Sequence, residues 1–258
     1  MSKRYKVIII ILAIYLVVFF LIYGLSNIKD GTRTLTILVG DNTVWEYSDK
    51  SWLNITREST IDSLSWQEYK VFLDNKYFGE YSMWYSDNKW YAFNSDKSAV
   101  KMEGELIAYR SNHDLKIKEF ETKENSNYTY VHQVLIENKL PTSSQMTVNN
   151  VVNFDIDNDG IEEQFYTISN AFASDFYPTT IFSIVFMVKD EKVYSMYTNI
   201  QEANYGNGCK PYIRSFLDIN DDDKHEVILT CAKYSVQEPE DMLFQLNKEK
   251  FDLLISNQ

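Results

Sequence analysis

Hydrophobic and polar residues alternate over short distances along most of this chain, and helical periodicity is scarce after residue 34. Short runs rich in Val, Ile, Tyr, Trp and Phe are separated by Asp, Asn, Lys and Ser. A period of two is typical of strands with one buried face, and polar interruptions are typical of turns between antiparallel strands. The pattern therefore predicts a mainly β fold from residue 35 onward.

Two segments of the first half predict β-hairpins. "TVWEYSDKSWLNIT" (43–56) and "YSMWYSDNKWYAFN" (81–94) each place two aromatic strands around a polar turn. The segment 59–73 is the one that a helix would also fit. We expect an aromatic-rich β-region at 35–125, whose tryptophans suit either cross-strand core packing or a binding platform for carbohydrate or peptide. These tryptophans are Trp45, Trp52, Trp66, Trp84 and Trp90.

The N-terminal residues form a separate apolar segment. "VIIIILAIYLVVFFLIYGL" (7–25) carries no charge and follows a basic flank, "MSKRYK". A helix of this length rises about 28 Å, close to the roughly 30 Å hydrocarbon core of a bilayer. We therefore expect a cytoplasmic tail at 1–6, a transmembrane helix at 7–25 and a linker at 26–34, with the remainder outside the cytoplasm. A cleaved signal peptide is the alternative, because "GLS" (24–26) offers small residues at a suitable spacing.

The charge of the chain limits its partners. The chain has 258 residues and a formal net charge of −12 at pH 7. Nucleic acids require a basic surface, so this balance argues against a nucleic-acid partner and favours a surface that attracts cations. The length allows one or two domains, and polar composition indicates a boundary between about 125 and 147, with "ETKENSNYTY" (121–130) as an exposed connection.

Two acidic segments of the second half match each other. "FDIDNDGIEEQF" starts at Phe154 and holds five carboxylates within nine residues, and "SFLDINDDDKHEVILT" starts at Ser215 and matches it at a shift of 63 positions. Apolar strands flank both segments, and the hairpin-like sequences downstream match at a shift of 58 positions. Within a second β-region at 148–258, we therefore expect two copies of one unit, 148–199 and 211–256, each with a strand, an acidic loop, a strand and a hairpin.

The spacing of these acids predicts calcium binding. Side chains at positions 1, 3 and 5 of a tight loop converge, and a carbonyl at position 7 with an acid at position 9 completes a shell of hard oxygen ligands, which suits Ca²⁺. Gly160 at position 6 permits a positive φ, whereas the second loop has Asp223 there, so we expect weaker binding at the second site. A solvated acidic turn is the alternative at both places. The predicted ligands are Asp155, Asp157, Asp159, the Ile161 carbonyl and Glu163 for the first site, and Asp218, Asn220, Asp222, the Lys224 carbonyl and Glu226 for the second.

This nine-residue loop between two strands resembles the calcium loops of FG-GAP or VCBS-type repeats, which occur in integrin alpha-chain propellers and in many bacterial exported proteins. An EF-hand is excluded, because position 12 is Tyr166 or Leu229 instead of Glu. The resemblance covers residues 148–258 and implies bound Ca²⁺ and propeller-like antiparallel β-repeats. The chain lacks a clear FG…GAP segment and shows two copies, whereas a closed propeller needs four or more blades. The hairpins of the first half would supply further blades or form a separate sheet.

The two cysteines, Cys209 and Cys231, lie in the part of the chain that we expect outside the cytoplasm. A disulfide can persist there, and two buried free thiols are the alternative. If the loop 218–226 joins antiparallel strands, Ile213 faces Cys231, which permits a disulfide without requiring it.

Signals for catalysis are weak in this sequence. The histidines, His113, His132 and His225, lack a metal-ligand spacing, and no G-x-S-x-G elbow is present. We therefore expect a membrane-anchored, extracytoplasmic, calcium-binding β-repeat protein that acts as a non-enzymatic binding or adhesion-type module for a protein or glycan ligand. The alternative is an exported hydrolase or carbohydrate-active protein that uses the repeats as a scaffold. Convergent titratable groups in a pocket would favour the enzyme, and a flat or aromatic surface would favour the binder.

Overall fold

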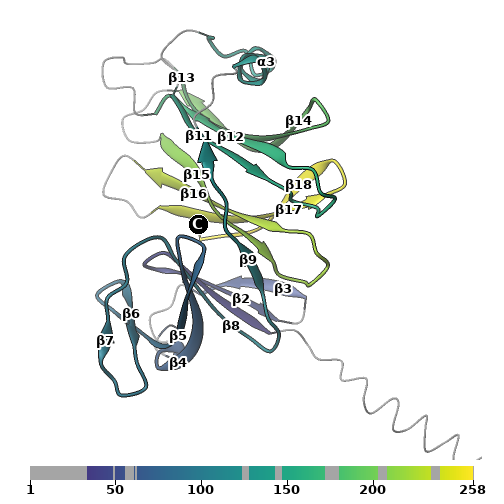
Figure 1. Ribbon diagram of the computed structural model, residues 1–258. Helices are drawn as coiled ribbons and strands as arrows, with labels where there is room; N and C mark the ends of the chain where they lie inside the picture. The colour runs from purple at the N-terminus through teal and green to yellow at the C-terminus, as the bar shows by residue number, and fades with distance from the viewer. Residues whose placement is uncertain are drawn as a thin grey trace, which may run out of the picture. The chain divides into compact units, whose positions relative to one another are not determined.

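The chain divides into two units, Met1–Arg33 and Thr34–Gln258, and the computed structural model describes the second (Figure 1). The described residues are 34–48, 50–55, 61, 63–123, 128–142, 147–171, 180–202, 208–233 and 239–257. The predicted cytoplasmic tail, the apolar segment 7–25 and the linker up to residue 33 lie outside them. Within the described ranges no helix is long and apolar enough to cross a membrane, so a transmembrane helix is not part of the architecture that the structure shows.

The first half folds into one eight-stranded antiparallel sheet, which we call sheet I. Its strand order is β3-β2-β1-β8-β4-β5-β6-β7. The strands are β1 (Leu35–Val39), β2 (Thr43–Ser48), β3 (Ser51–Asn54), β4 (Gln67–Leu73), β5 (Lys76–Ser86), β6 (Lys89–Phe93), β7 (Ala99–Val100) and β8 (Leu106–Ser111).

Both predicted hairpins are present in sheet I. Strands β2 and β3 pair across the segment 43–56, and β5 and β6 pair across 81–94. The turn of the second hairpin has positive φ values at Asp87 (53°) and Asn88 (59°), which matches the right-handed twist of the strands. Strand β4 occupies the last 7 residues of the segment 59–73, for which a helix was the alternative, and residues 61, 63 and 64 are helical.

The second half forms two five-stranded antiparallel sheets of matching order. Sheet II has the order β18-β17-β16-β15-β9, and sheet III has the order β10-β11-β12-β13-β14. Sheet II contains β9 (Lys116–Lys118), β15 (Cys209–Asp218), β16 (Glu226–Lys233), β17 (Glu240–Asn247) and β18 (Lys250–Ser256). Sheet III contains β10 (Thr122–Lys123), β11 (Thr147–Phe154), β12 (Glu163–Ser169), β13 (Thr180–Lys189) and β14 (Lys192–Glu202).

The two sheets agree beyond their strand order. The β13–β14 hairpin has its bulge between Val185 and Phe186, and the β17–β18 hairpin has its bulge between Leu243 and Phe244, which is the same place at the 58-residue shift. One short segment also serves both sheets, because β9 pairs with β15 and β10 pairs with β11. Each expected unit of strand, acidic loop, strand and hairpin is therefore a four-stranded meander with a short edge strand.

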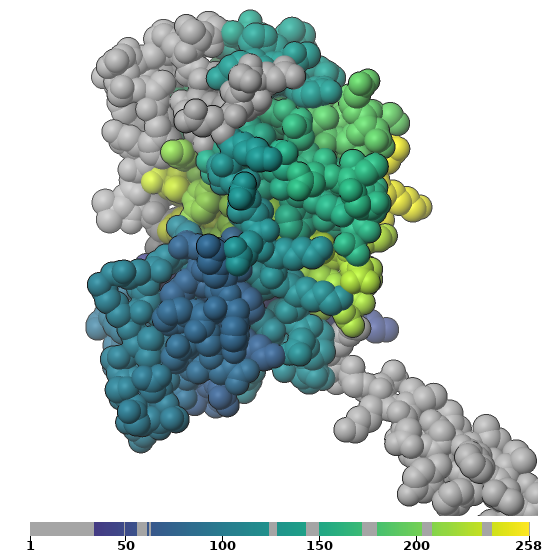
Figure 2. Space-filling view, viewed as in Figure 1, coloured from purple at the N-terminus to yellow at the C-terminus, as the bar shows by residue number. Residues whose placement is uncertain are grey.

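The sheets stack as layers (Figure 1), and buried apolar residues fill the space between them. Sheets II and III share a core in which Phe154 and Phe216 stack at 3.8 Å. The other face of sheet II packs against Leu35, Ile37 and neighbouring residues of sheet I. In the space-filling view the blue surface of sheet I adjoins the teal surface of the later strands (Figure 2). A further core lies on the opposite face of sheet I, between β1, β2 and β4–β6.

The expectation of propeller-like repeats is wrong, because other elements pack on the outer faces of the sheets. Helix α3 (Thr129–Glu137) buries Val131 and Leu135 on the outer face of sheet III, where a propeller would need its next blade. The hairpins of the first half belong to one eight-stranded sheet instead of separate blades. Among the described residues, no propeller is closed. Helix α3 and β10 also occupy parts of the 121–147 region that we expected to be a connection.

The two cysteines form a disulfide, with Cα atoms 5.4 Å apart. The register predicted for them is wrong, because Cys231 faces Pro211 and Ile213 faces Leu229. The pairing already differs by one position at the loop, where Leu217 pairs with Glu226, and a bulge between Ile213 and Ser215 shifts the later pairs by one more. The shift brings Cys209 to the position diagonal to Cys231, within reach of a disulfide.

Candidate metal-binding loops

The first acidic segment forms a tight loop between β11 and β12, which we call loop 1 (155–163). The Asp155 carboxylate accepts hydrogen bonds from the backbone N–H groups of Asp159 (3.1 Å) and Gly160 (2.9 Å). The Asp159 carboxylate accepts one from the N–H of Ile161 at 2.8 Å, and the Ile161 side chain faces solvent. These bonds fold the loop, because carboxylates stabilise a turn by accepting from its backbone.

Glu163 closes loop 1 from the first position of β12. Its side chain is fully buried, and its Oε2 atom accepts a hydrogen bond from the N–H of Ile156 at 3.0 Å. The Oε1 atom is also buried and forms an ion pair with Lys189, whose Nζ lies 2.8 Å away. One oxygen of Glu163 therefore stabilises the backbone of loop 1, and the other faces the remaining carboxylates of this loop.

The second acidic segment, loop 2 (218–226), repeats this hydrogen-bond pattern between β15 and β16. Asp218 accepts from the N–H groups of Asp222 and Asp223, each at 3.2 Å. Asp222 accepts from Lys224 at 2.9 Å, and Asn220 also accepts from the N–H of Asp222 at 3.1 Å. The last acid of the loop, Glu226, accepts from the N–H of the second loop residue at 3.0 Å, as Glu163 does.

Backbone conformation confirms the equivalence of the two loops. The positive φ predicted for Gly160 is present, at 87°, and Asp223 at the same position of loop 2 has φ 62°. Position 4 is also left-handed, at Asn158 (57°) and Asp221 (58°), which the sequence analysis missed. Asn and Asp tolerate this region better than most residues, so the sequence of each loop suits its conformation.

Loop 1 gathers its acids around one point. Asp155, Asp157 and Asp159 each offer a carboxylate oxygen, and these atoms lie within 4.8 Å of one another. Among the described residues this is the one group of three or more acids, histidines or cysteines that meets this spacing. The donor set consists of hard oxygen atoms, which suits Ca²⁺ or Mg²⁺.

A lysine that the sequence analysis missed lies at the centre of loop 1. Lys189, at the end of β13, places Nζ 2.7 Å from Asp157 Oδ2, 2.8 Å from Asp159 Oδ2 and 2.8 Å from Glu163 Oε1. Burial opposes its charge, but hydrogen bonds to these three acids outweigh burial and raise the pKa of Lys189. Its hydrogen bond lowers the pKa of Asp159. Lys189 thus supplies a positive charge to the point at which the carboxylates converge.

Loop 2 has its own lysine, from a different strand. Lys116 of β9 places Nζ 2.7 Å from Asp223 Oδ1, 3.0 Å from Asp221 Oδ1 and 3.4 Å from Asp218 Oδ2. The hydrogen bonds to Asp223 and Asp221 raise the pKa of Lys116. The Nε2 atom of Gln245 donates a hydrogen bond to Glu226 Oε1 at 3.0 Å, so a neutral amide takes the place at Glu226 that Lys189 takes at Glu163.

Pairing between neighbouring strands, and not spacing along the sequence, explains why both lysines lie beside the acids of the loops. Lys116 is the registered partner of Asp218 on the neighbouring strand. The β12–β13 register pairs Gln164 with Val188, which places Lys189 beside Glu163. A known register would have revealed both contacts, whereas the local sequence around each lysine carries no signal.

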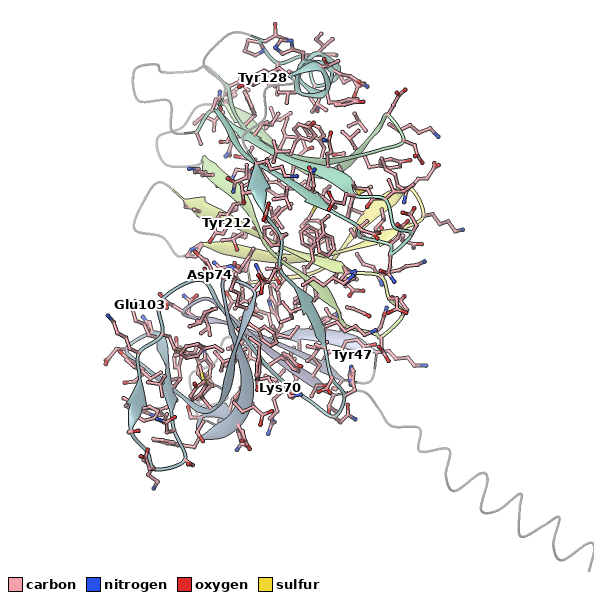
Figure 3. The ribbon with its side chains drawn as sticks, in the orientation of Figure 1. Tyr47, Lys70, Asp74, Glu103, Tyr128 and Tyr212 are labelled. Carbon is pink, nitrogen blue, oxygen red and sulfur yellow. A yellow bond between two sulfur atoms is a disulfide. The ribbon has the colours of Figure 1, made fainter. Side chains whose placement is uncertain are left out.

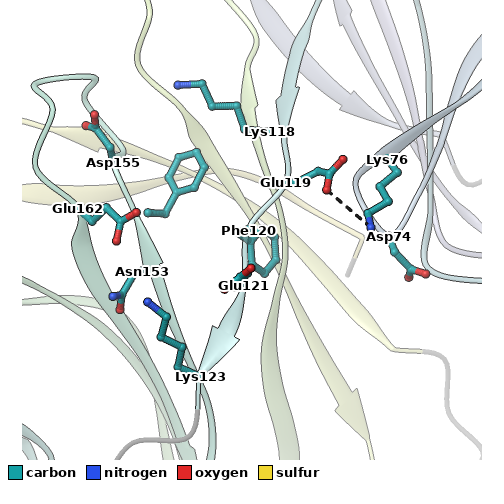
Figure 4. A pocket seen from close by; sticks show the side chains of 11 residues that line it. Asp74, Lys76, Lys118, Glu119, Phe120, Glu121, Lys123, Asn153, Asp155 and Glu162 are labelled. Atoms are coloured by element: carbon teal, nitrogen blue, oxygen red, sulfur yellow. Dashed lines mark ion pairs between the residues drawn. The ribbon is translucent and has the colours of Figure 1, made fainter.

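A polar cavity of about 530 Å³ opens beside loop 1 (Figure 4). Five acids and three lysines line it, Asp155 and Glu162 among them. Lys118 extends toward the loop, with Nζ 3.5 Å from Asn158 Oδ1 and 6.0 Å from the centre of the Phe154 ring. The cavity gives solvent, and any dissolved cation, a path to Asp155.

A second polar cluster joins sheets I and II beside a cavity of about 410 Å³. Arg214 is nearly buried, donates to Thr230 Oγ1 and to Tyr212 Oη at 2.8 Å each, and pairs with Glu105. Figure 3 labels Tyr212 on β15 above the edge of sheet I. Burial raises the pKa of Tyr212 to about 12, far from neutral pH. These groups satisfy one another, so the cluster favours a structural link over acid–base catalysis.

Compared with known protein families, curated proteins and solved structures, the chain shows no significant match. The resemblance of loops 1 and 2 to FG-GAP or VCBS-type calcium loops therefore remains a prediction from the sequence pattern.

Proposed function

We propose that this protein is an extracytoplasmic, membrane-attached, calcium-binding module without enzymatic activity. The observation that carries the proposal is the convergence of Asp155, Asp157 and Asp159 within 4.8 Å beside the buried Oε1 atom of Glu163. Three of these four carboxylates, those of Asp155, Asp159 and Glu163, are fixed by backbone hydrogen bonds, and the set offers oxygen ligands for a hard cation. In this proposal they hold Ca²⁺ in loop 1, as the resemblance to FG-GAP or VCBS-type repeats implies.

The position of Lys189 implies that calcium binding is an exchange of cations. Its ammonium group lies 2.7–2.8 Å from three of the four acids, so Ca²⁺ has to displace it. In the absence of the metal, the lysine offsets the repulsion among the carboxylates. Calcium binding is then an exchange of one cation for another, and its net affinity is lower than the acids alone would give.

Loop 2 is the weaker calcium site in this proposal. Its third position is Asn220, and Lys116 and Gln245 already pair with Asp218 and Glu226. A cation there would also have to break existing contacts and would gain one fewer carboxylate than in loop 1.

The proposed location rests on two features of the chain. A charge-free segment at 7–25 follows a basic flank, and the disulfide between Cys209 and Cys231 persists in oxidising compartments outside the cytoplasm. The groups around Arg214 hydrogen-bond and ion-pair with one another, which supports a structural role for this cluster.

Thermal unfolding of the full-length protein tests the metal proposal. A metal that binds only the folded state stabilises it by roughly 2.7 kcal/mol at a hundredfold excess over Kd. Millimolar Ca²⁺ should therefore raise the melting temperature above that measured in chelator, and Asp157→Ala should remove most of the shift. Glu162→Ala is the matched control, because it removes a carboxylate from the same loop outside the proposed ligand set. Equal melting with Ca²⁺ and chelator would show that the loops are solvated turns.

A further inference from the structure

Four aromatic side chains cover the outward face of the β5–β6 hairpin and the residue that precedes β4. We call this group, Trp66, Trp84, Tyr91 and Phe93, the aromatic platform. Trp66 is 51% exposed, Trp84 36% and Tyr91 37%. Trp45 and Trp90, by contrast, are buried in the cores of sheet I. The tryptophans of the first half thus divide between the two roles that the sequence left open.

The rings of the platform form one continuous surface. The Trp66 and Trp84 rings stack with their centroids 6.0 Å apart and their planes inclined by 20°. Phe93 lies 5.1 Å from Trp66, and Tyr91 lies 5.9 Å from Trp84, its registered partner across the hairpin. Because both β5 and β6 are paired strands of sheet I, the rings stand on a rigid base (Figure 1).

The backbone of Trp66 is held in a conformation that a bulky side chain rarely adopts. Its φ is 62°, in the left-handed region that bulky side chains avoid. Its N–H is held by the carbonyl of Met83 at 2.6 Å. Strained backbone of this kind is characteristic of ligand-binding positions, where the surrounding structure fixes it. Core packing does not explain the strain, because half of the side chain is exposed.

The size of the platform argues against a protein partner. At 150–250 Å² for a whole aromatic side chain, the exposed fractions amount to roughly 300 Å². A stable protein–protein interface needs about 800 Å² from each partner. The rings alone are therefore smaller than such an interface, and a folded protein would need further surface around them, whereas a ligand of one or two rings would be covered by the platform itself.

The rim of the platform indicates the chemistry of that ligand. Glu68 and Ser82 stand in the same cross-strand row as Phe93, and Ser86 faces Lys89 in the row beyond Trp84 and Tyr91. The rim thus offers hydrogen-bond donors and acceptors and charges of both signs. A pyranose ring has an apolar C–H face and a hydroxyl edge, which match flat aromatic faces bordered by such groups. Balanced charge favours a neutral sugar.

We propose that the aromatic platform binds one or two residues of a neutral oligosaccharide. The inference names a ligand class for the proposed binding module and rests on that part of the proposed function. It does not depend on calcium, because the platform belongs to sheet I and the acidic loops belong to sheets II and III.

Calorimetric titration of the full-length protein with four soluble hexasaccharides tests the inference. The probes are the hexamers of β-1,4-glucose, β-1,4-N-acetylglucosamine, β-1,4-mannose and α-1,4-glucose. We expect saturable binding of at least one of them. Trp66→Ala and Trp84→Ala should each weaken that binding at least tenfold. Tyr128→Ala is the matched control, because it removes a 44% exposed aromatic ring at the start of α3 and should change nothing.

A second variant separates binding from folding. Trp66→Gly removes the ring but suits the left-handed backbone, so it should melt higher than Trp66→Ala and bind equally poorly. Absence of binding by all four hexasaccharides at millimolar concentration would overturn the inference, as would binding that survives both alanine variants. Dimerisation that Trp66→Ala abolishes would assign the platform to a second copy and would also overturn it. A calcium-dependent melting shift, measured on the same samples, shows whether a failure concerns the platform alone or the metal proposal.

Discussion

At the scale of single residues, two lysines explain how the crowded acids of this chain remain together. Lys189 contacts three carboxylates of loop 1, and Lys116 contacts three of loop 2. The Lys189 side chain is 18% exposed, whereas that of Lys116 is 47% exposed. Solvent screens the contacts of Lys116 more strongly, so Lys189 is the greater contributor to stability.

Replacing Lys189 should therefore have opposite effects on stability and on calcium binding. Lys189→Met leaves the buried Glu163 carboxylate without its counter-charge, which costs about 3 kcal/mol when a buried pair is broken. The variant should unfold at a lower temperature than the parent in chelator, regain stability with Ca²⁺ and bind Ca²⁺ more tightly. Calorimetric melting in both conditions measures this. The exposed Lys192→Met is the control, and a variant as stable as the parent in chelator would contradict the assigned role.

At the scale of elements, local sequence patterns predicted the features that depend on contacts between residues close together in the sequence. The hairpins β2–β3 and β5–β6 follow from alternating aromatic residues around polar turns, and the position of loop 1 follows from its acids and Gly160. Strands β9 and β10 were missed, because they are 3 and 2 residues long and form only by pairing with distant strands. The lysine contacts were missed for the same reason.

The bulge in β15 shows a second limit of prediction at this scale. A register counted outward from a loop depends on the first pair, which was predicted one position away from the observed Leu217–Glu226 pair, and no local signal marked the bulge between Ile213 and Ser215 that shifts it again. The disulfide depends on this shift. The sequence alone therefore did not decide whether Cys209 and Cys231 are bonded, and the structure shows that they form a disulfide.

The disulfide makes a prediction about location and stability. Protein isolated from cells without reduction should show Cys209 and Cys231 joined by mass spectrometry, with neither thiol open to alkylation. Replacing both cysteines with alanine should cost about 3 kcal/mol, the range for a loop of this length. Two alkylatable thiols in protein from the cell envelope would contradict both the bond and the oxidising location.

At the scale of the whole described unit, the predicted mainly β composition is present and the predicted propeller-like arrangement is wrong. The alternation of apolar and polar residues predicts strands, but it does not reveal which element packs on each face of a sheet. Helix α3 buries the outer face of sheet III, and sheet I covers the outer face of sheet II, so the two matching sheets are enclosed within a stack of layers. A ring of blades is excluded by these long-range contacts, which the sequence pattern does not carry.

Arg214 is the polar link between sheets I and II in this stack. Asp241 of β17 accepts hydrogen bonds from Thr230 Oγ1 at 2.6 Å and from Thr43 Oγ1 of sheet I at 2.7 Å. Arg214 Nε lies 3.6 Å from the same carboxylate. Both charged side chains are nearly inaccessible to solvent, so each needs the other.

Removing this link should destabilise the protein in a pH-dependent way. Arg214→Ala leaves Asp241 buried and unpaired, which costs about 3–5 kcal/mol. Burial already raises the pKa of Asp241, and Arg214 opposes that shift. Without Arg214 the folded state retains the proton to a higher pH than the unfolded chain does, so stability is lost as the pH rises through the folded pKa.

The loss of stability should therefore be smaller at pH 5 than at pH 8, as measured by thermal or denaturant unfolding of parent and variant. Arg110→Ala, at an exposed arginine that donates to Gln67, is the control and should cost less than about 0.5 kcal/mol. A loss that is equal at both pH values would contradict the role of Asp241.

The central claim is that the acids of loop 1 bind Ca²⁺ in exchange for Lys189, and titration calorimetry of the full-length protein with CaCl₂ tests it most directly. We predict a saturable site that Asp157→Ala abolishes, Glu162→Ala retains and Lys189→Met strengthens, with a second, weaker site that Asp222→Ala removes. No binding heat in the parent and in Lys189→Met at millimolar Ca²⁺ would contradict the claim and leave the lysines as the permanent counter-ions of two structural turns.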